Sequence, residues 1–440
     1  MPFWLRMILF VLAMLLLAGV TTWYVWRRSA FAAGLGRRGK RALAVALFSG
    51  PVMMIAARSF EPLLPRDVAA LLGAVGATVL LGTWISTVLV GTLDLGFLAA
   101  RWLRRARGKT APAATHTVAA SDTASVADTA SVADSASVSA SDSDSASDSV
   151  SEPIAETPSL GTLPRRALLR RSLTGAALSV GFGAAGYGAL FGRRDYEITE
   201  VPIPIPGLSP RLDGYRIAQI SDVHFGTYVG EPELRSAVAL MREARPDLIV
   251  LTGDLLDHDA AYAPWLGRMV RAFSELGPRD GVTVIPGNHD YYAGVEAVLS
   301  VSREGGGTVL RNQSRVIGDG HIALVGVDDV WARRNGDGPG PDLERALADA
   351  PPDLPRVLLC HNPVFFPEAA GEVALQLSGH THGGQVNLGV RPAEFVLPYV
   401  EGLYVEQGSR LYVNRGFGTA GPPARVGAPP EITLAVLTAA

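Results

Sequence analysis

The chain has 440 residues, and its 39 Lys plus Arg and 42 Asp plus Glu give a formal net charge of −3. Its one cysteine, Cys360, excludes an intrachain disulfide framework and a cysteine-based zinc site. Both lysines, Lys40 and Lys109, precede Asp195, so the rest of the chain has no lysine for a Schiff base or a P-loop. From Asp195 onward, 19 Arg stand against 31 Asp plus Glu, and this acidic balance opposes binding to nucleic acid.

The first hundred residues contain three strongly apolar segments, at 7–26, 42–57 and 68–100. A helix needs about 20 apolar residues to cross a bilayer, and the second segment is shorter and contains Pro51. We expect residues 1–109 to form a membrane region with about three transmembrane helices. Basic residues crowd the loop after the first segment and the stretch after the third, which predicts that both are cytoplasmic.

Residues 110–164 are rich in Ala, Ser and Asp and contain a six-residue repeat that starts at Asp122, Asp128 and Asp134. They have little large apolar surface, so we expect a disordered linker rather than a β-solenoid.

Residues 165–194 combine a basic flank with a fourth, mildly apolar segment at 172–191. Arg170, Arg171 and Ser172 resemble the start of a twin-arginine export signal, and an ordinary anchor with a basic cytoplasmic flank is the alternative. Positive charge before such a segment predicts that the following domain, 195–440, is tethered on the periplasmic or extracellular side of the cell membrane.

Short apolar runs in the last domain predict strands, and segments with helical spacing lie between several of them. Early strand-helix alternation indicates an α/β layered fold with a mixed sheet towards the C-terminus. The expected helices are 232–245, 264–276 and 342–350. The expected strands are 216–220, 247–251, 282–285, 322–327, 356–359, 374–377, 411–413 and 432–437.

Five short polar clusters follow such runs, at the places where strands of a buried sheet would end. Their side chains are Asp, His and Asn, and mixed nitrogen and oxygen donors without thiolate suit Mn, Fe or Zn. We expect a site for two divalent metal ions that hold a hydroxide for in-line attack on a phosphoester. The candidate ligands are Asp222, His224, Asp254, Asn288, His361, His380 and His382.

Other polar residues have less defined roles. His289 is next to a ligand and is the candidate to protonate the leaving oxygen, and Asp290 is the candidate to hold its imidazole in position. Arg415 could clamp a phosphate, or form a structural salt bridge. Asp257 and His258 are expected on a loop facing solvent, or else near the substrate, and Cys360 is expected to be a small buried apolar side chain.

The clusters Asp222-Val-His224, Gly253-Asp254, Gly287-Asn-His-Asp290, His361-Asn362 and Gly379-His-Thr-His382 resemble, in this order, the calcineurin-like metallophosphoesterases. The segments 379–385, 412–418 and 429–433 are similar to the family's membrane-associated bacterial branch, which includes phosphodiesterases. The resemblance implies a metallophosphoesterase-type sandwich of two mixed β-sheets flanked by helices. It also implies Asp222, His224 and His382 at one metal, Asn288, His361 and His380 at the other, Asp254 between them, and His289 as the catalytic histidine.

We therefore expect a membrane-tethered metal-dependent phosphohydrolase, more specifically a phosphodiesterase. Because the domain is tethered, we expect a phosphoester substrate that is lipid-linked or belongs to the envelope. Two alternatives stay open. One is a phosphomonoesterase acting on nucleotides or phosphoproteins, and the other is a non-catalytic membrane sensor that binds a phosphorylated ligand.

Overall fold

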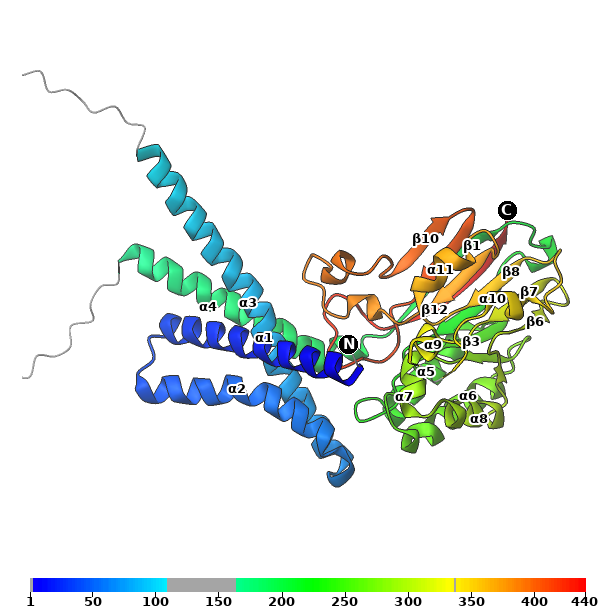
Figure 1. The fold of residues 1–440 in the computed structure, drawn as a ribbon, viewed down its shortest axis with the longest axis horizontal. Coiled ribbons are helices and arrows are strands. Elements are labelled where there is room, and N and C mark those ends of the chain that lie inside the picture. The colour runs from blue at the N-terminus through cyan, green and yellow to red at the C-terminus, as the bar shows by residue number, and fades with distance from the viewer. Residues whose placement is uncertain (1–2, 109–163, 336–337) are drawn as a thin grey trace, which may run out of the picture. The chain divides into compact units, whose positions relative to one another are not determined.

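A computed structural model of the chain describes residues 3–108, 164–335 and 338–440 (Figure 1). The linker expected over residues 110–164 lies, apart from its last residue, outside the described residues. The chain divides into two compact units, one of Met1–Gly91 with Arg171–Ala440 and one of Thr92–Arg170. In the second unit, the guanidinium of Arg170 lies over the ring of Phe97 and 3.9 Å from the carboxylate of Asp94.

Four long helices contain the expected apolar segments: α1 (Phe3–Ala32), α2 (Arg37–Ser59), α3 (Arg66–Gly108) and α4 (Arg165–Leu190). Among the described residues, three stretches are long and apolar enough to cross a membrane, namely Arg37–Ser59, Arg66–Arg105 and Ala167–Arg194. The first expected span lies in α1, several of whose side chains are outside the described residues. Large apolar side chains such as Leu16, Val45 and Leu71 are exposed on these helices, which fits lipid as their surroundings.

The first β-sheet of the last domain has six strands in the order β1-β12-β2-β3-β4-β5. Strands β2, β3, β4 and β5 are parallel neighbours, β12 pairs antiparallel with β2, and β1 pairs parallel with β12. The bounds are β1 (Glu197–Ile205), β2 (Tyr215–Ile220), β3 (Leu248–Thr252), β4 (Val282–Ile285), β5 (Thr308–Val309) and β12 (Glu431–Ala439).

The second β-sheet also has six strands, in the order β10-β11-β9-β8-β7-β6. Its four central strands are parallel neighbours, and the two edge strands pair antiparallel. The bounds are β6 (Gln313–Ile317), β7 (Ile322–Gly326), β8 (Arg356–Leu359), β9 (Leu375–Ser378), β10 (Gly402–Glu406) and β11 (Ser409–Val413).

The two sheets pack face to face, and helices cover their outer faces. Alternate residues of one strand point to opposite faces, so Leu248 and Val250 of β3 join the core between the sheets while Ile249 and Leu251 pack under helices. Burial on both faces explains why these strands are continuous apolar runs. The helices over the first sheet are α5 (Glu231–Ala244), α6 (Ala263–Glu275) and α8 (Val295–Glu304), and those over the second are α10 (Leu343–Leu347) and α11 (Phe366–Ala369).

The expected sandwich of two mixed sheets with flanking helices is confirmed, and the expected strands are present within two residues at each end. The sequence analysis missed β1, β5, β6 and β10. In β1, Pro202 and Pro204 interrupt the apolar residues. A proline is tolerated there because β1 is an edge strand, where an N–H that faces away from the sheet needs no partner. The helix expected over 342–350 is shorter in the structure, and Asp342 caps its N-terminus by accepting from the Arg345 amide.

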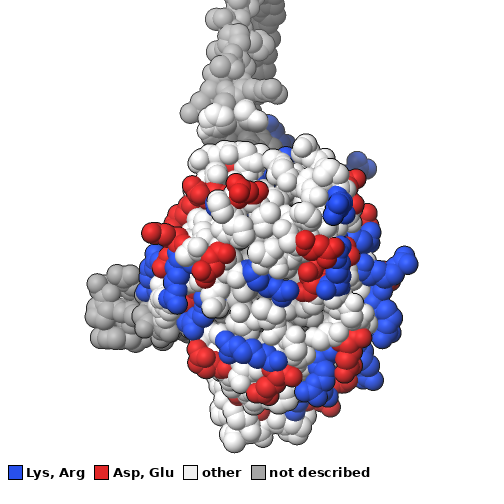
Figure 2. All heavy atoms as spheres, turned by 90° about the vertical axis from the view of Figure 1, so that its right-hand side faces the viewer, with Lys and Arg blue, Asp and Glu red and all other residues white. Residues whose placement is uncertain are grey.

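Figure 2 shows one face of the molecule with acidic and basic side chains interspersed among uncharged ones. Among the side chains drawn there, neither sign forms a continuous patch. This face therefore carries no single-sign field of the kind that steers a highly charged partner.

Candidate metal centre

The polar clusters lie at the carboxyl ends of neighbouring parallel strands. Asp222 and His224 follow β2, Asp254 follows β3, and Asn288 begins α7 (Asn288–Ala293) after β4. In the other sheet, His361 follows β8, and His380 and His382 follow β9. Carboxyl ends of parallel strands meet at one edge of a sheet. The face-to-face packing of the two sheets brings both edges together, so residues from distant parts of the chain converge.

The backbone at this edge is left-handed at several non-glycine residues. Of the ten such positive-φ residues among the described residues, five are candidate ligands: Asp222, His224, Asp254, His380 and His382, with φ between 51° and 73°. This conformation is uncommon for residues with a Cβ, and such residues collect at functional sites. Asp222 and His224 are both left-handed, and their side chains reach one cluster.

One group of side chains consists of Asp222, His224 and His382. Nε2 of His382 lies 3.3 Å from Oδ1 of Asp222 and 3.1 Å from Nε2 of His224. All three residues are buried. Their ligand atoms lie within 4.8 Å of one another and could hold a metal ion. The Asp222 carboxylate also accepts a hydrogen bond from the His380 amide at 3.0 Å, which fixes its orientation.

A second group consists of Asp254, His361 and His380, whose ligand atoms also lie within 4.8 Å of one another. Nε2 of His361 is 3.2 Å from Oδ2 of Asp254 and 3.3 Å from Nδ1 of His380. Nδ1 of His361 lies 2.8 Å from the carbonyl oxygen of Thr252, to which it donates. Such a hydrogen bond fixes the tautomer that leaves Nε2 with a lone pair for a cation.

Asp254 lies between the two groups, since its Oδ2 is also 3.8 Å from Nε2 of His224. Asn288 is buried nearby, and its Oδ1 has no hydrogen-bond partner. A buried carbonyl oxygen without a partner is costly, and a cation is one partner that would satisfy it.

Glycines leave the space for this cluster. A Cβ at Gly379 would lie 2.0 Å from Oγ of Ser221 and 2.2 Å from a carboxylate oxygen of Asp222. A Cβ at Gly287 would lie 2.4 Å from Oδ1 of Asp254. A residue with a side chain at either position would clash with a neighbouring residue of the site, which explains why both positions are glycine.

Burial and neighbouring charges shift the pKa values of the cluster. Burial lowers the pKa of His224 and of His380 to about 4, and it lowers the pKa of His382 well below its usual value. Burial lowers the pKa of His361 as well, but the Asp254 carboxylate raises it well above its usual value. Three of the four imidazoles are thus neutral at neutral pH, which is the form that binds a metal.

His289 lies beside the two groups and is partly exposed. Its Nδ1 is 2.7 Å from the carbonyl oxygen of Asp257 and 3.6 Å from that residue's carboxylate. Burial lowers the pKa of His289, but the hydrogen bond to Asp257 and the nearby Asp254 raise it to about 9. The ring is therefore protonated at neutral pH.

The structure places Asp257, and not Asp290, against the imidazole of His289. The Asp290 carboxylate accepts from the amides of Leu255 and Leu256 and from that of Gly287 at 2.8 Å. Asp290 sits in the first turn of α7, where successive side chains project in different directions, so it closes the helix N-terminus instead of facing its neighbour. Asp257 is buried, contrary to the expectation of a solvent-facing loop residue.

Arg425 is a residue that the sequence analysis missed. Its guanidinium is buried, lies 3.1 Å from Nδ1 of His382, and donates to the carbonyl oxygens of Gly416 and Gly418. Burial lowers its pKa to about 10. In the sequence, Arg425 is a single arginine in a segment of mostly Gly, Pro and Ala. This pattern does not indicate that the arginine contacts His382.

The remaining candidates have structural partners. Arg415 forms ion pairs with Glu431 at 2.6 Å and Glu197 at 2.8 Å, and these contacts agree with the salt-bridge alternative rather than with a free phosphate clamp. Cys360 is buried as expected.

Comparisons with known proteins place the last domain in a family. Residues 215–384 match the family described as calcineurin-like phosphoesterase. The chain is 34% identical over 281 residues to the Bacillus subtilis (strain 168) metallophosphoesterase YkuE. The match covers 60% of this chain and 93% of the relative. A metallophosphoesterase of Aquifex aeolicus (strain VF5) is 30% identical over 230 residues, 52% of this chain and 87% of the relative.

A longer relative from Danio rerio is described as a transmembrane protein with a metallophosphoesterase domain. It is 33% identical over 264 residues, which are 58% of this chain and 60% of the relative. The chain thus spans about three fifths of the length of that protein.

Proposed function

Because the chain belongs to the calcineurin-like metallophosphoesterase family, we propose that it is a membrane-tethered, two-metal phosphodiesterase. Phosphoric ester hydrolysis is the chemistry of the family. The observation that carries the proposal is the convergence of seven ligand-type side chains at one edge of the sandwich, with two imidazole pairs only 3.1 Å and 3.3 Å apart. A cation bound by both rings of a pair would hold their nitrogen atoms this close together.

The residues fit two metal ions. We assign Asp222, His224 and His382 to one ion, Asn288, His361 and His380 to the other, and Asp254 to both. The unpartnered oxygen of Asn288 supports the second set. The donors are imidazole nitrogens and oxygens, which suit Mn, Fe or Zn. When bound, such a pair neutralises phosphoryl oxygens and lowers the pKa of a water molecule.

The side chains around the ions determine the remaining steps. Hydrolysis forms one bond between phosphorus and a water oxygen and breaks the bond to the leaving oxygen. His289 carries the proton that the leaving oxygen needs, because its neighbours raise its pKa to about 9. Nδ1 is engaged by Asp257, so the proton is donated from Nε2.

A lipid-linked or envelope phosphoester is the substrate that we propose. The loop that follows the last ligand exposes Val390 (60%), Phe395 (84%) and Val396 (79%). Asn387 ties this loop to the site, because its side-chain amide donates to the carbonyl oxygen of Gly383 at 2.9 Å. Exposed apolar side chains beside a site mark a surface for apolar material, and a tethered domain works close to lipid.

We further propose that the chain crosses the membrane several times and that the domain faces the periplasm or the cell exterior. The basic residues after α1, at the end of α3 and at the start of α4 support this orientation. Labelling of an engineered cysteine at the exposed residue Arg211 with a membrane-impermeant reagent tests it. Labelling in intact cells is expected; labelling only after lysis would reverse the orientation.

The activity test uses the full-length protein, stripped with a chelator and reloaded with Mn, Fe or Zn. We expect metal-dependent hydrolysis of an aryl phosphodiester at a higher rate than of the matching aryl phosphomonoester. Faster monoester hydrolysis would overturn the diester assignment. Retained metal without hydrolysis of either substrate would favour the sensor alternative and contradict the enzyme.

The substrate class has its own test, with phospholipid vesicles as the probe. The double substitution Phe395→Ser with Val396→Ser is expected to slow hydrolysis of vesicle phospholipid while the rate on the soluble aryl diester stays unchanged. Equal effects on both substrates would contradict a lipid-facing role of the loop.

A further inference from the structure

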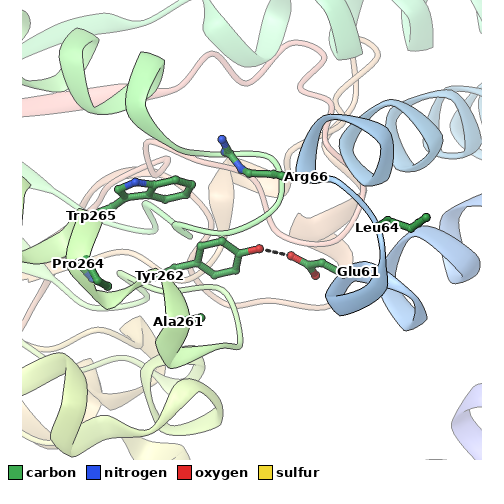
Figure 3. A pocket seen from close by; sticks show the side chains of 7 residues that line it. All are labelled: Glu61, Leu64, Arg66, Ala261, Tyr262, Pro264 and Trp265. Carbon is green, nitrogen blue, oxygen red and sulfur yellow. Dashed lines mark hydrogen bonds between the residues drawn. The ribbon is translucent and has the colours of Figure 1, made fainter.

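The short segment Arg58–Arg66 joins α2 to α3 and contacts the last domain close to the metal centre. It contains the turn η1 (Glu61–Leu63). With α6 and the turn before it, the segment lines a pocket of about 330 Å³, shown in Figure 3. The pocket residues are Glu61, Leu64, Arg66, Ala261, Tyr262, Pro264 and Trp265.

The first contact joins Arg58 to Asp257, the residue that holds His289. A guanidinium nitrogen of Arg58 lies 2.5 Å from Oδ2 of Asp257. The other carboxylate oxygen of Asp257 is 3.6 Å from Nδ1 of His289 and 3.8 Å from Nδ1 of His224. Arg58 is therefore connected, through one buried carboxylate, to the proposed acid and to one proposed ligand.

The second contact is made by Glu61. Its carboxylate lies 3.2 Å from Nε2 of His258 and accepts hydrogen bonds from the hydroxyls of Thr227 and Tyr262. The Tyr262 bond is drawn in Figure 3. Nδ1 of His258 is in turn 3.1 Å from Asp257. Glu61 thus reaches the same carboxylate as Arg58 by a second route.

The third contact is made by Arg66, at the start of α3. Its guanidinium lies 4.4 Å from the centre of the Trp265 ring and donates to the carbonyl oxygen of Gly226 at 3.2 Å. Gly226 follows the Asp222-Val-His224 cluster by two residues, so this bond fixes the loop that carries two proposed ligands. Arg58, Glu61 and Arg66 therefore form a network, because they reach three different points around one site, namely Asp257, His258 and the loop at Gly226.

We infer that Arg58–Arg66 is a positioning element of the active centre, in which Arg58 and Glu61 hold Asp257 and His258 and thereby fix His289. The element that positions the active centre thus belongs to this chain's own membrane region. Arg58–Arg66 is too short to cross a bilayer. Because the segment also contacts the last domain, both lie on the same side of the membrane. This placement agrees with the orientation proposed from the basic residues, which is independent of it.

Crosslinking tests the contact itself, whatever the activity. Leu64 and Ala261 line the same pocket, and the only native cysteine, Cys360, is buried. In membranes that contain the full-length chain, Leu64→Cys with Ala261→Cys is expected to join through a flexible bismaleimide and to give one linked peptide pair by mass spectrometry. Each single variant is the control. No link, although both cysteines react with a monomaleimide, would overturn the inference.

Kinetics test the positioning role, which rests on the proposed function. Arg58→Met is expected to lower kcat on the aryl diester roughly tenfold, at the low end for residues behind metal ligands, with KM and bound metal unchanged. Arg58→Lys is expected to recover most of the loss. Leu63→Gln is the matched control, because Leu63 is 80% exposed in the same segment.

Equal kcat values for Arg58→Met and Leu63→Gln would overturn the positioning role. If Arg58→Met loses metal or does not fold, Glu61→Gln replaces it, because this substitution keeps the side-chain volume; an unchanged kcat there would also overturn the role. A wild-type chain without hydrolase activity would instead refute the proposed function, while the crosslink would still report the contact.

Discussion

The candidate metal centre and the Arg58–Arg66 segment place their polar side chains in different ways. In the candidate metal centre, Asp and His residues lie in short local motifs at strand ends, and the backbone is left-handed at five of the seven candidate ligands. In the segment, single charged side chains reach partners 160 to 201 residues away, and Arg58 is 42% exposed. The candidate ligands can thus be recognised from local sequence motifs, whereas the contacts between the site and the membrane region are made by isolated pairs of residues far apart in the sequence.

The largest effect is expected at the centre of the cluster. Asp254→Asn removes the carboxylate that lies between the two groups, so it should lower kcat/KM on the aryl diester by more than 100-fold, beyond the range for residues behind ligands. Rate measurements together with metal analysis check this. Asp213→Asn is a control at an exposed carboxylate of the same domain. Comparable activity of Asp254→Asn and Asp213→Asn would contradict the assignment of Asp254.

A smaller effect, with a particular substrate dependence, is expected at His289. His289→Gln should lower kcat roughly 100-fold for a diester with a poor leaving group, because general acid catalysis contributes about 10² to 10⁴. The loss should shrink for a nitrophenyl leaving group, which needs no proton, and the bound metal should be unchanged. A series of leaving groups measures this dependence. An equal loss across the series would show that His289 does not donate the proton.

The smallest effect on catalysis is expected at Arg415, where stability should change instead. Arg415→Met leaves the buried Glu431 without its ion-pair partner, and breaking a buried pair costs about 3 kcal/mol. Denaturant unfolding should report that loss, while KM for the aryl diester stays within about twofold. A large rise in KM with unchanged stability would restore the role of a phosphate clamp.

Much of the fold and the cluster could be predicted from the sequence for physical reasons. Strands such as β3 are buried on both faces and appear as unbroken apolar runs, and the polar residues after them have few structural explanations at a sheet edge. The resemblance of the ordered clusters to the calcineurin-like metallophosphoesterases then implied how the ligands are grouped. Strand β1 could not be predicted in this way, because its prolines are tolerated only in an edge strand. Which strand lies at an edge depends on pairing between strands that are far apart in the sequence.

The surroundings of the site could not be predicted in the same way. Asp257 and Asp290 are both close in sequence to proposed site residues, and only the three-dimensional arrangement decides which carboxylate faces His289. Arg425 and Glu61 come from segments without a motif, and their partners are 43 and 201 residues away. Pairs at such separations leave no periodic or local pattern in the sequence.

The central claim is that seven side chains from two sheets bind a pair of adjacent metal ions. A crystal structure of the full-length protein, with anomalous scattering recorded at the absorption edges of Mn, Fe and Zn, tests it most directly. The account predicts two anomalous peaks, one among Asp222, His224 and His382 and one among Asn288, His361 and His380, with Asp254 between them. A single peak, or none, in protein that hydrolyses the diester would contradict it.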